Sequence, residues 1–369
     1  MSIRHLLAVL LVVVTSTLAA AAQAGLSRYT VTALPTGTNA LGINNAGTVV
    51  GDIATPDGRR GFIWSGQGGG SFTLLDTLGG TDGTATAINA SGTVTGYAAI
   101  PSGDAHAYRY SRGSLTDLGV FGNANSFGIA INNRGQVAGQ YIDPASQFRA
   151  FLSAGSTSVD LGTLGGSFAY AGGINNKGEV VGVSALDDVT PFLAHAFVYR
   201  NGSMTDLGTF GGSYSSASDI NDAGQIVGHA WGNGVEHAFL YQNGSMADIG
   251  SLDGGRSYAT AINEAGLVVG YSEQASADNA AFLYADGVMS NLNTLIDPAS
   301  GWYLYAATGI NDNAQIIAYG CRADDCGAVL LDVASTAPEP EAWALMLGGL
   351  GVVGWLGRRK RASAACRCA

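Results

Sequence analysis

The stretch INNAGTVVG, which begins at Ile43, is followed by six near copies along the chain. Each copy opens with Ile-Asn, passes through two variable residues and a small residue, and ends in a short apolar run. The copies begin at residues 43, 88, 131, 174, 220, 262 and 310, so the period stays between 42 and 48 residues. A period of this length is typical of repeat architectures in which each unit is one supersecondary element.

Three further segments recur within each period. An apolar run such as HAFVY (195–199) comes first, a short run such as SMTDLG (203–208) follows an Asn-Gly turn, and a Gly-rich connector such as TFGG (209–212) leads into the next copy. Polar and apolar residues alternate with period two, and no window sustains a period of 3.6 residues. The chain is therefore predicted to be all-β, with four strands per unit.

The number of strands predicts how the repeats close. The last repeat ends at 330–333 without its fourth strand, whereas the N-terminal run YTVTAL (29–34) precedes the first repeat and is left over. A ring closes if this run completes the last unit, which removes two open sheet edges. We expect a seven-bladed β-propeller over residues 27–334, closed by the N-terminal strand. An open β-solenoid is the alternative.

Charge limits the partners of this domain. Residues 25–357 hold 11 basic and 28 acidic residues, a net charge of −17. So acidic a domain repels phosphate backbones, which argues against a nucleic-acid partner. We expect no cofactor and no metal site, and calcium is the one ion that the composition leaves open.

Residues 1–24 are predicted to be a secretory signal peptide. One Arg precedes an apolar stretch, and an A-x-A site ends it at Ala22 and Ala24, the residues that signal peptidase would read. An uncleaved anchor is the alternative.

Residues 335–369 form a second targeting segment in three parts. The tripeptide Pro338, Glu339 and Pro340 comes first, an apolar run over 342–357 follows, and the basic cluster Arg358, Arg359, Lys360 and Arg361 would stop transfer. The apolar run is shorter than the ~20 residues of a usual membrane-spanning helix. We therefore expect a single hydrophobic helix that holds the chain in the membrane at least transiently and is later removed, with a plain membrane anchor as the alternative.

This tail resembles the PEP-CTERM sorting domain of Gram-negative bacteria, in the order and spacing of its three parts. The resemblance implies that an exosortase processes the chain near Pro338–Pro340 after an inner-membrane stage, and that the product reaches the cell surface or the extracellular space. We have no account of Cys366 and Cys368, which follow the basic cluster.

The repeats resemble those of the HAF-repeat extracellular proteins, through His-Ala-Phe at 195–197 and 237–239 combined with the DLGTLGG and IN-x-x-G motifs. This resemblance implies an exported repeat protein of undefined molecular activity. It brings no catalytic residues.

The Asn and Gly of the repeat suit a turn. Asn at the first position of a type I turn accepts from the backbone N–H two residues on, and Gly supplies the left-handed residue that follows. We assign this structural role, in preference to a ligand site, to Asn44, Gly47, Asn89, Gly92, Asn132, Gly135, Asn175, Gly178, Asn221, Gly224, Asn263 and Gly266. Asn311 fits as well, but Ala314 replaces its Gly, which predicts a strained or different turn.

Recurring acids and histidines are also interpreted as structural. The acids Asp117, Asp160, Asp206 and Asp248 are expected to bind backbone donors of a neighbouring turn, and Leu74, Ala33 and Asn291 break their series. The histidines His106, His195 and His237 open three HAF-type strands, where Gly61, Arg149, Ala280 and Gly327 stand in the other units. Because the three do not fall in adjacent units, hydrogen bonds within a blade are favoured over zinc. Cys321 and Cys326 are expected to form a disulfide in an oxidising compartment.

These features predict an exported, exosortase-sorted protein of the cell surface or extracellular matrix, with a non-catalytic binding or structural role and exopolysaccharide as the candidate partner. A propeller-fold carbohydrate lyase or hydrolase is the alternative. It would place non-repeated polar residues together at a central pocket, and its candidates are Arg59, Arg60, Tyr141, Arg149, Trp231, Arg256 and Trp302.

Overall fold

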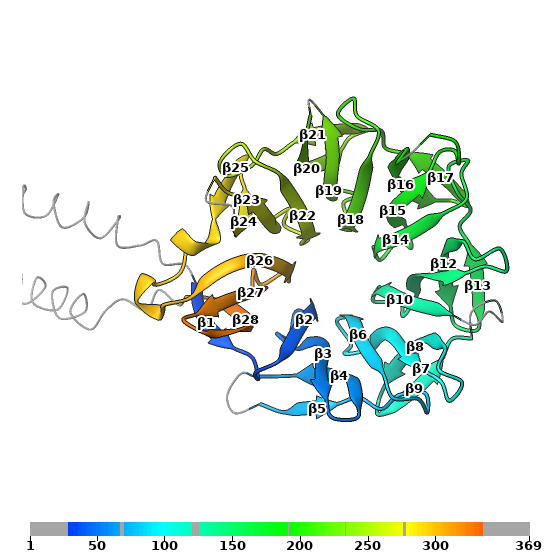
Figure 1. The fold of residues 1–369 in the computed structure, drawn as a ribbon, viewed down its shortest axis with the longest axis horizontal. Coiled ribbons are helices and arrows are strands. Elements are labelled where there is room, and N and C mark those ends of the chain that lie inside the picture. The colour runs from blue at the N-terminus through cyan, green and yellow to red at the C-terminus, as the bar shows by residue number, and fades with distance from the viewer. Residues whose placement is uncertain are drawn as a thin grey trace, which may run out of the picture. The chain divides into compact units, whose positions relative to one another are not determined.

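Seven four-stranded antiparallel sheets surround a central channel in the computed structural model (Figure 1). The structure describes residues 29–334, apart from 67–69, 120, 122–124, 191, 233 and 276–277. No helix in this described part is long and apolar enough to cross a membrane. The prediction of a seven-bladed propeller is confirmed.

Six blades are formed by consecutive strands, numbered from the channel outwards. Blade 1 comprises β2 (Thr38–Ile43), β3 (Val49–Thr55), β4 (Gly58–Trp64) and β5 (Phe72–Leu74). Blade 2 comprises β6 (Gly83–Ile88), β7 (Val94–Ala99), β8 (Ala105–Ser111) and β9 (Ser114–Asp117). Blade 3 comprises β10 (Ser126–Ile131), β11 (Val137–Ile142), β12 (Phe148–Ala154) and β13 (Thr157–Asp160).

The next three blades repeat this plan. Blade 4 comprises β14 (Ala169–Ile174), β15 (Val180–Ala185), β16 (Ala194–Arg200) and β17 (Ser203–Asp206). Blade 5 comprises β18 (Ser215–Ile220), β19 (Ile226–Gly232), β20 (Val235–Gln242) and β21 (Ser245–Asp248). Blade 6 comprises β22 (Ser257–Ile262), β23 (Val268–Glu273), β24 (Asn279–Ala285) and β25 (Val288–Asn291).

Blade 7 joins the two ends of the domain. It contains β26 (Tyr303–Ile310), β27 (Ile316–Arg322) and β28 (Asp325–Val333), and its outermost strand is β1 (Tyr29–Ala33). Strands β1 and β28 pair antiparallel, with Tyr29 opposite Val333 and Ala33 opposite Val329. Two short 3-10 helices, η2 (Leu292–Thr294) and η3 (Pro298–Ser300), lead into this blade. The predicted closure by the N-terminal strand is therefore confirmed.

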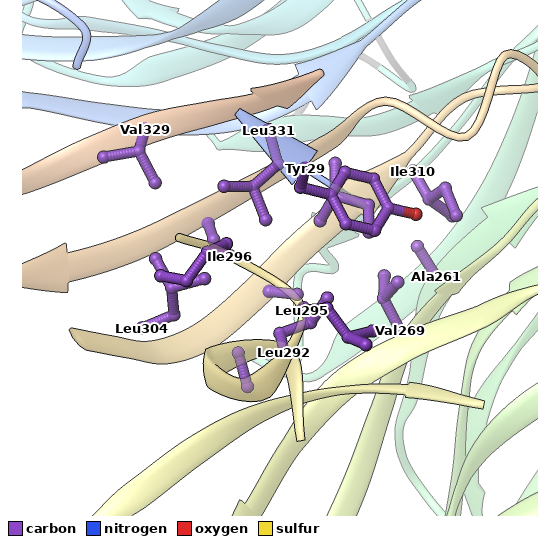
Figure 2. Packing of buried hydrophobic residues seen from close by; sticks show 14 residues of the cluster. Tyr29, Ala261, Val269, Leu292, Leu295, Ile296, Leu304, Ile310, Val329 and Leu331 are labelled. Carbon is purple, nitrogen blue, oxygen red and sulfur yellow. The ribbon is translucent and has the colours of Figure 1, made fainter. Parts of the chain in front are cut away.

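The hydrophobic core is divided among the blade interfaces. Each of seven buried clusters combines residues of two neighbouring blades, because a single four-stranded sheet cannot cover its own apolar face. The Phe of the HAF motif supplies the largest side chain at several of these interfaces, and Phe197 and Phe239 are fully buried. The largest cluster surrounds Tyr29, whose ring lies among Leu295, Ile310 and other apolar side chains where β1 meets blades 6 and 7 (Figure 2).

Glycine on the second strand makes room for that Phe in blades 1, 3, 4, 5 and 6, and for Tyr108 in blade 2. Gly139 lies opposite Phe151 in the register, and a Cβ at Gly139 would stand 2.1 Å from the backbone oxygen of Phe127 and 2.7 Å from the Phe151 ring. The last Gly of the repeat motif is therefore required by close packing. In blade 7 the pair is Ala318 and Val329, so a larger second-strand residue faces a smaller partner.

Candidate functional site

All seven Ile-Asn turns lie on one face of the ring, which we call the Asn face and define by residues 44–48, 89–93, 132–136, 175–179, 221–225, 263–267 and 311–315. In the first of these turns, Asn44 Oδ1 accepts from the backbone N–H groups of Ala46 and Thr48, both at 3.0 Å. Gly47 closes the turn with a φ of 73°. Each Asn oxygen thus holds its own turn together.

The side-chain nitrogens of these Asn residues form hydrogen bonds between blades, which the repeat pattern did not predict. Each Nδ2 donates to the backbone oxygen of the equivalent Asn in the next blade, and the seven bonds form a closed circle around the channel. In chain order the pairs are Asn44–Asn89 (3.2 Å), Asn89–Asn132 (2.9 Å), Asn132–Asn175 (3.0 Å), Asn175–Asn221 (3.1 Å), Asn221–Asn263 (3.1 Å), Asn263–Asn311 (3.0 Å) and Asn311–Asn44 (2.9 Å). Each Asn is at most 7% exposed, so these bonds are shielded from water.

Ala314 keeps the same turn as its glycine counterparts. Its N–H donates to the backbone oxygen of Asn311 at 3.0 Å, and its φ is 58°. The hydrogen bonding of this turn does not differ from the others. The strain lies in the left-handed backbone, which disfavours a residue with a Cβ.

A second ring, interrupted once, is formed by the residue after each Asn. Its members are Asn45, Ala90, Asn133, Asn176, Asp222, Glu264 and Asp312, and they line a cavity of about 160 Å³ at the mouth of the channel. The backbone N–H of one member donates to the side chain of the next, as from Asn176 to Asp222 (2.7 Å) and from Glu264 to Asp312 (2.9 Å). Ala90 has no side-chain acceptor, which interrupts the ring between blades 1 and 2.

The carboxylates of this ring are not spread evenly. Asp222, Glu264 and Asp312 occupy adjacent blades 5, 6 and 7. Burial raises the pKa of Glu264, and the negative charges of Asp222 and Asp312 raise it further. This part of the mouth is therefore an electronegative segment beside amide-bearing blades.

Farther along the channel one carboxyl group departs from the repeat. Asp219 occupies an inner-strand position that is Gly or Ala in the other six blades, and it lines a cavity of about 230 Å³. Its Oδ1 accepts from Ile220 N–H (2.8 Å), and its Oδ2 accepts from Ile262 N–H in blade 6 (3.0 Å). Burial raises the pKa of Asp219 to about 6, with a smaller contribution in the same direction from Glu264.

Sequence reasoning missed Asp219, although a signal for it existed. Alignment of the seven inner strands shows one acid in a series of small residues. The neighbouring blade supplies a matching feature, since a Cβ at Gly173 would stand 2.9 Å from the Asp219 Cα and 3.0 Å from its Oδ1. The Gly172-Gly173 pair of blade 4 therefore leaves room for the Ser218-Asp219 pair of blade 5.

On the opposite face, the recurring acids and histidines form pairs. His106 Nδ1 lies 2.8 Å from Asp117, His195 lies 2.9 Å from Asp206, and His237 lies 2.8 Å from Asp248. The other oxygen of each carboxylate, as in Asp117, accepts from the backbone N–H two residues on. The acids thus bind donors of their own turn, whereas we had expected donors of a neighbouring turn.

This pairing explains why a blade that has Asp at one position has His or Arg at the other. Blade 3 replaces His with Arg149, which lies 3.5 Å from Asp160, and Tyr141 donates to the same carboxylate at 2.9 Å. The remaining three blades lack both His and Asp. One equivalence was wrong, because the strand register puts Arg60, and not Gly61, at the His position of blade 1. Glycines at both 58 and 61, on either side of Arg59 and Arg60, hid this shift of one residue.

The non-repeated residues proposed for an enzyme do not meet at the channel. The inner strands and Ile-Asn turns line both channel cavities, and none of the seven candidates is among the lining residues. Several have partners of their own: Arg59 pairs with Asp52, Arg256 lies 3.8 Å from Glu273, and Trp302 lies under the Arg322 guanidinium, 5.2 Å from it. Arg60 donates to the Leu75 carbonyl at 2.7 Å, and Trp231 is 41% exposed. The described structure does not bring these seven candidates together at the channel, because the outer hairpins carry most of them.

Cys321 and Cys326 form a disulfide across the β27–β28 hairpin, where they are directly opposite in the register. In the described part of the chain, no group of three or more His, Cys, Asp or Glu residues could hold a metal ion. The signal peptide with Ala22 and Ala24, and the tail with its sorting motif and basic cluster, lie outside the described residues.

Comparisons with known proteins identify two segments. A family described as a protein of unknown function, DUF3466, matches residues 169–324, and the PEP-CTERM protein-sorting motif matches residues 336–361. The first match covers blades 4 to 6 and much of blade 7. The second coincides with the predicted sorting tail. No curated protein matches the chain.

Solved structures match the propeller at low identity. A puromycin-hydrolyzing peptidase from Mycobacterium tuberculosis is 12% identical with a TM-score of 0.56, and the match covers 82% of this chain and 54% of that one. TolB from Acinetobacter baumannii is 11% identical with a TM-score of 0.43, over 78% of this chain and 80% of that one. The WD40 β-propeller domain of Doa1 is 11% identical with a TM-score of 0.48, over 84% and 98%. At such identities the likeness to the peptidase shows the fold alone. The matched PEP-CTERM motif identifies the C-terminal segment as a signal for exosortase-dependent sorting out of the cell.

Proposed function

We propose that this protein is an exosortase-processed component of the cell surface or extracellular matrix of a Gram-negative bacterium, with a non-catalytic binding role toward exopolysaccharide. The observation that carries the proposal is the PEP-CTERM motif over residues 336–361, directly after the last strand of the propeller. The ring is the part that remains outside the cell after processing. The resemblance to HAF-repeat extracellular proteins, which rests on sequence motifs, agrees with this role.

The organisation of the ring supports a binding role over catalysis. The repeated polar residues are engaged in holding the blades, as the Asn circle and the His–Asp pairs illustrate. Positions that vary between blades, such as 45, 90 and 134, lie on exposed or partly exposed turns. A rigid scaffold with variable turns is the arrangement by which repeat proteins present binding surfaces.

The sorting step is tested by replacing Pro338, Glu339 and Pro340 together with alanine in the full chain. We expect an uncleaved form that is retained in the membrane fraction, while the wild-type product is released to the surface. The double variant Ser335→Ala, Thr336→Ala serves as the control, since it changes adjacent residues and spares the tripeptide. Unchanged processing of the triple variant would refute the sorting claim.

The binding role is tested with the processed protein on a panel of polysaccharides, with parallel assays of binding and of chain cleavage. We expect retention without release of shorter products. The alternative enzyme would use Asp219, the carboxyl group in the channel with a pKa near neutrality. Cleavage that disappears in Asp219→Asn would replace the binding role with that alternative.

A further inference from the structure

A cavity of about 350 Å³ lies between blades 4 and 5 on the Asn face. Lys177 from the Ile-Asn turn of blade 4 and Arg200 from the end of β16 line one side. Thr205, Tyr241 and Asn243 contribute a hydroxyl, a phenol ring and an amide to the wall. Glu179 also lines the cavity, where it pairs with Arg200, so Lys177 is the cation of the lining that no carboxylate of the described residues neutralises. Two cations against one carboxylate, with polar neutral groups and one aromatic ring, suit a small polar anion.

Arg200 carries a donor with no acceptor. Its Nε is buried and makes no hydrogen bond within the described structure, although it forms an ion pair with Glu179 Oε1 at 3.6 Å. The equivalent contact is closed in blade 5, where Gln225 donates to Gln242 at 3.1 Å. A buried guanidinium N–H without a hydrogen bond costs free energy. Arg149 Nε and His237 Nε2 of the opposite face lack one in the same way, so the site here is inferred from the cavity and its cations.

Three further cations join Lys177 along the Asn face. Arg109 and Arg112 belong to blade 2, Arg134 to blade 3 and Lys177 to blade 4, and none of the four makes an ion pair within the described residues. The guanidinium of Arg109 approaches the blade 3 turn, since it would lie 3.9 Å from a Cβ at Gly135. Blades 2 to 4 therefore present a basic strip on a domain with a large negative charge.

The arginines of the opposite face behave differently. Every one of them is ion-paired with a nearby carboxylate; the pairs are Arg59–Asp52, Arg60–Asp76, Arg149–Asp160, Arg256–Glu273 and Arg322–Asp325. Among the described residues, the cations without an ion pair therefore all lie on blades 2 to 4 of the Asn face. Such confinement favours a partner that brings its own negative charges.

We propose that the cavity between blades 4 and 5 binds a carboxylate-bearing sugar residue of an acidic polysaccharide, and that the polymer continues along the basic strip toward Arg134 and Arg109. The sugar carboxylate accepts from the exposed part of the Arg200 guanidinium, whose side chain is 41% exposed, and from Lys177, because guanidinium and ammonium groups form the strongest hydrogen bonds to carboxylates. Tyr241 contacts the sugar ring, and Asn243 and Thr205 bond its hydroxyl groups. This inference rests on the proposed function and adds the ligand class and its site.

A second copy of the chain is the competing occupant. Asp222, Glu264 and Asp312 make blades 5 to 7 of the same face acidic, so they could pair with the basic strip of another ring. The cavity beside the basic strip favours the glycan, because a flat contact between rings would not fill it. The oligomeric state is therefore measured in the same experiment.

The test uses the full processed protein with polygalacturonate, and methyl-esterified polygalacturonate as the uncharged form of the same backbone. The Arg200→Gln, Lys177→Ala variant removes both cations, and blade 5 carries Gln242 and Ala223 at these positions, so the substitutions suit the fold. Arg256→Gln removes one positive charge from the opposite face as the control. We expect salt-sensitive binding of the acidic polymer alone and an affinity loss of about tenfold to a hundredfold in the double variant.

Each result has a distinct meaning. Binding of both polymers, or binding that the double variant retains, overturns the inference while the proposed polysaccharide role stands. Absence of binding to either polymer, in a protein that binds no other polysaccharide of the panel, refutes both. Salt-sensitive dimers that the double variant abolishes, without polymer binding, assign the strip to self-association and overturn the glycan site.

Discussion

Asn311 Nδ2 donates to the backbone oxygen of Asn44 across 267 residues of sequence, at 2.9 Å. This bond joins the last blade to the first on the channel side, while the pairing of β1 with β28 closes blade 7 on its outer side. The ring is therefore fastened at both its inner and outer radius. The following predictions test the contributions of individual residues to that closure and to the channel.

Asn311→Asp is expected to lower the free energy of unfolding by about 2–3 kcal/mol at neutral pH. The carboxylate can still accept from Asn313 and Gln315 N–H, but it cannot donate to Asn44, and it places a negative oxygen against that carbonyl. Urea unfolding measures the effect. Part of the loss should be recovered in acid, where a protonated carboxyl donates again. Asn313→Asp, on an exposed bond, is the control with a loss under about 1 kcal/mol; equal losses in the two variants would contradict the role of the circle.

Ala314→Gly is expected to stabilise the protein by about 0.5–1 kcal/mol. The φ of 58° at Ala314 lies in the left-handed region, where Gly has no Cβ penalty. Thermal unfolding measures the gain as a higher Tm. Ala265→Gly is the matched control, because that turn residue does not have a positive φ and should lose stability. A decrease in Tm for Ala314→Gly would show that the turn carries no relievable strain.

Asp219→Ala is expected to change how stability depends on pH. The pKa of Asp219 in the folded protein is about 6, above its unfolded value of 3.8, so the folded state binds more protons between these values. Wild-type stability therefore falls as pH rises from about 4 to about 7, and the fall stops above that range. The variant, which has the residue type of neighbouring blades, should lack this decline. Urea unfolding at pH 5 and pH 8 measures it, and parallel curves for the two proteins would contradict the raised pKa.

Tyr29→Ala is expected to destabilise the protein by about 3 kcal/mol or more. The side chain is 5% exposed within the cluster that joins β1 to blades 6 and 7 (Figure 2). Its loss leaves a cavity where the N-terminal strand closes the ring. Thr30→Ala, an exposed neighbour on the same strand, is the control with little effect. Unfolding curves compare the two, and a negligible effect of Tyr29→Ala would show that closure does not depend on this cluster.

Much of the fold could be predicted from the sequence because the repeat is strict. The period, the alternation of strands and the missing fourth strand in the last unit led to seven blades and to closure by β1. The register of the strands was harder to predict where glycines and small residues stand at the strand ends. The assignment of Gly61 to the His position failed for that reason, since the register puts Arg60 there.

The candidate site was less predictable because it depends on contacts between blades. The sequence shows that Lys177 and Arg200 are 23 residues apart, but not that they line one cavity with Tyr241 of the next blade. It shows an acid at 219 in place of a small residue, but not the burial that raises its pKa. Charged residues on separate turns can be assigned to one surface only once the order of the blades around the ring is known.

The sequence by itself determined the repeat unit, the all-β architecture and the C-terminal sorting motif, because these depend on local patterns of turns, alternation and apolar length. Only the tertiary structure determined which side chains of neighbouring blades contact one another. Asn44 and its six equivalents hold their own turns through Oδ1, as turn chemistry requires, and the ring adds the Nδ2 bonds that connect each blade to the next. Asn311 Nδ2 also donates to Gln315 within its own repeat, whereas its acceptor in the first blade comes into contact only when the ring closes.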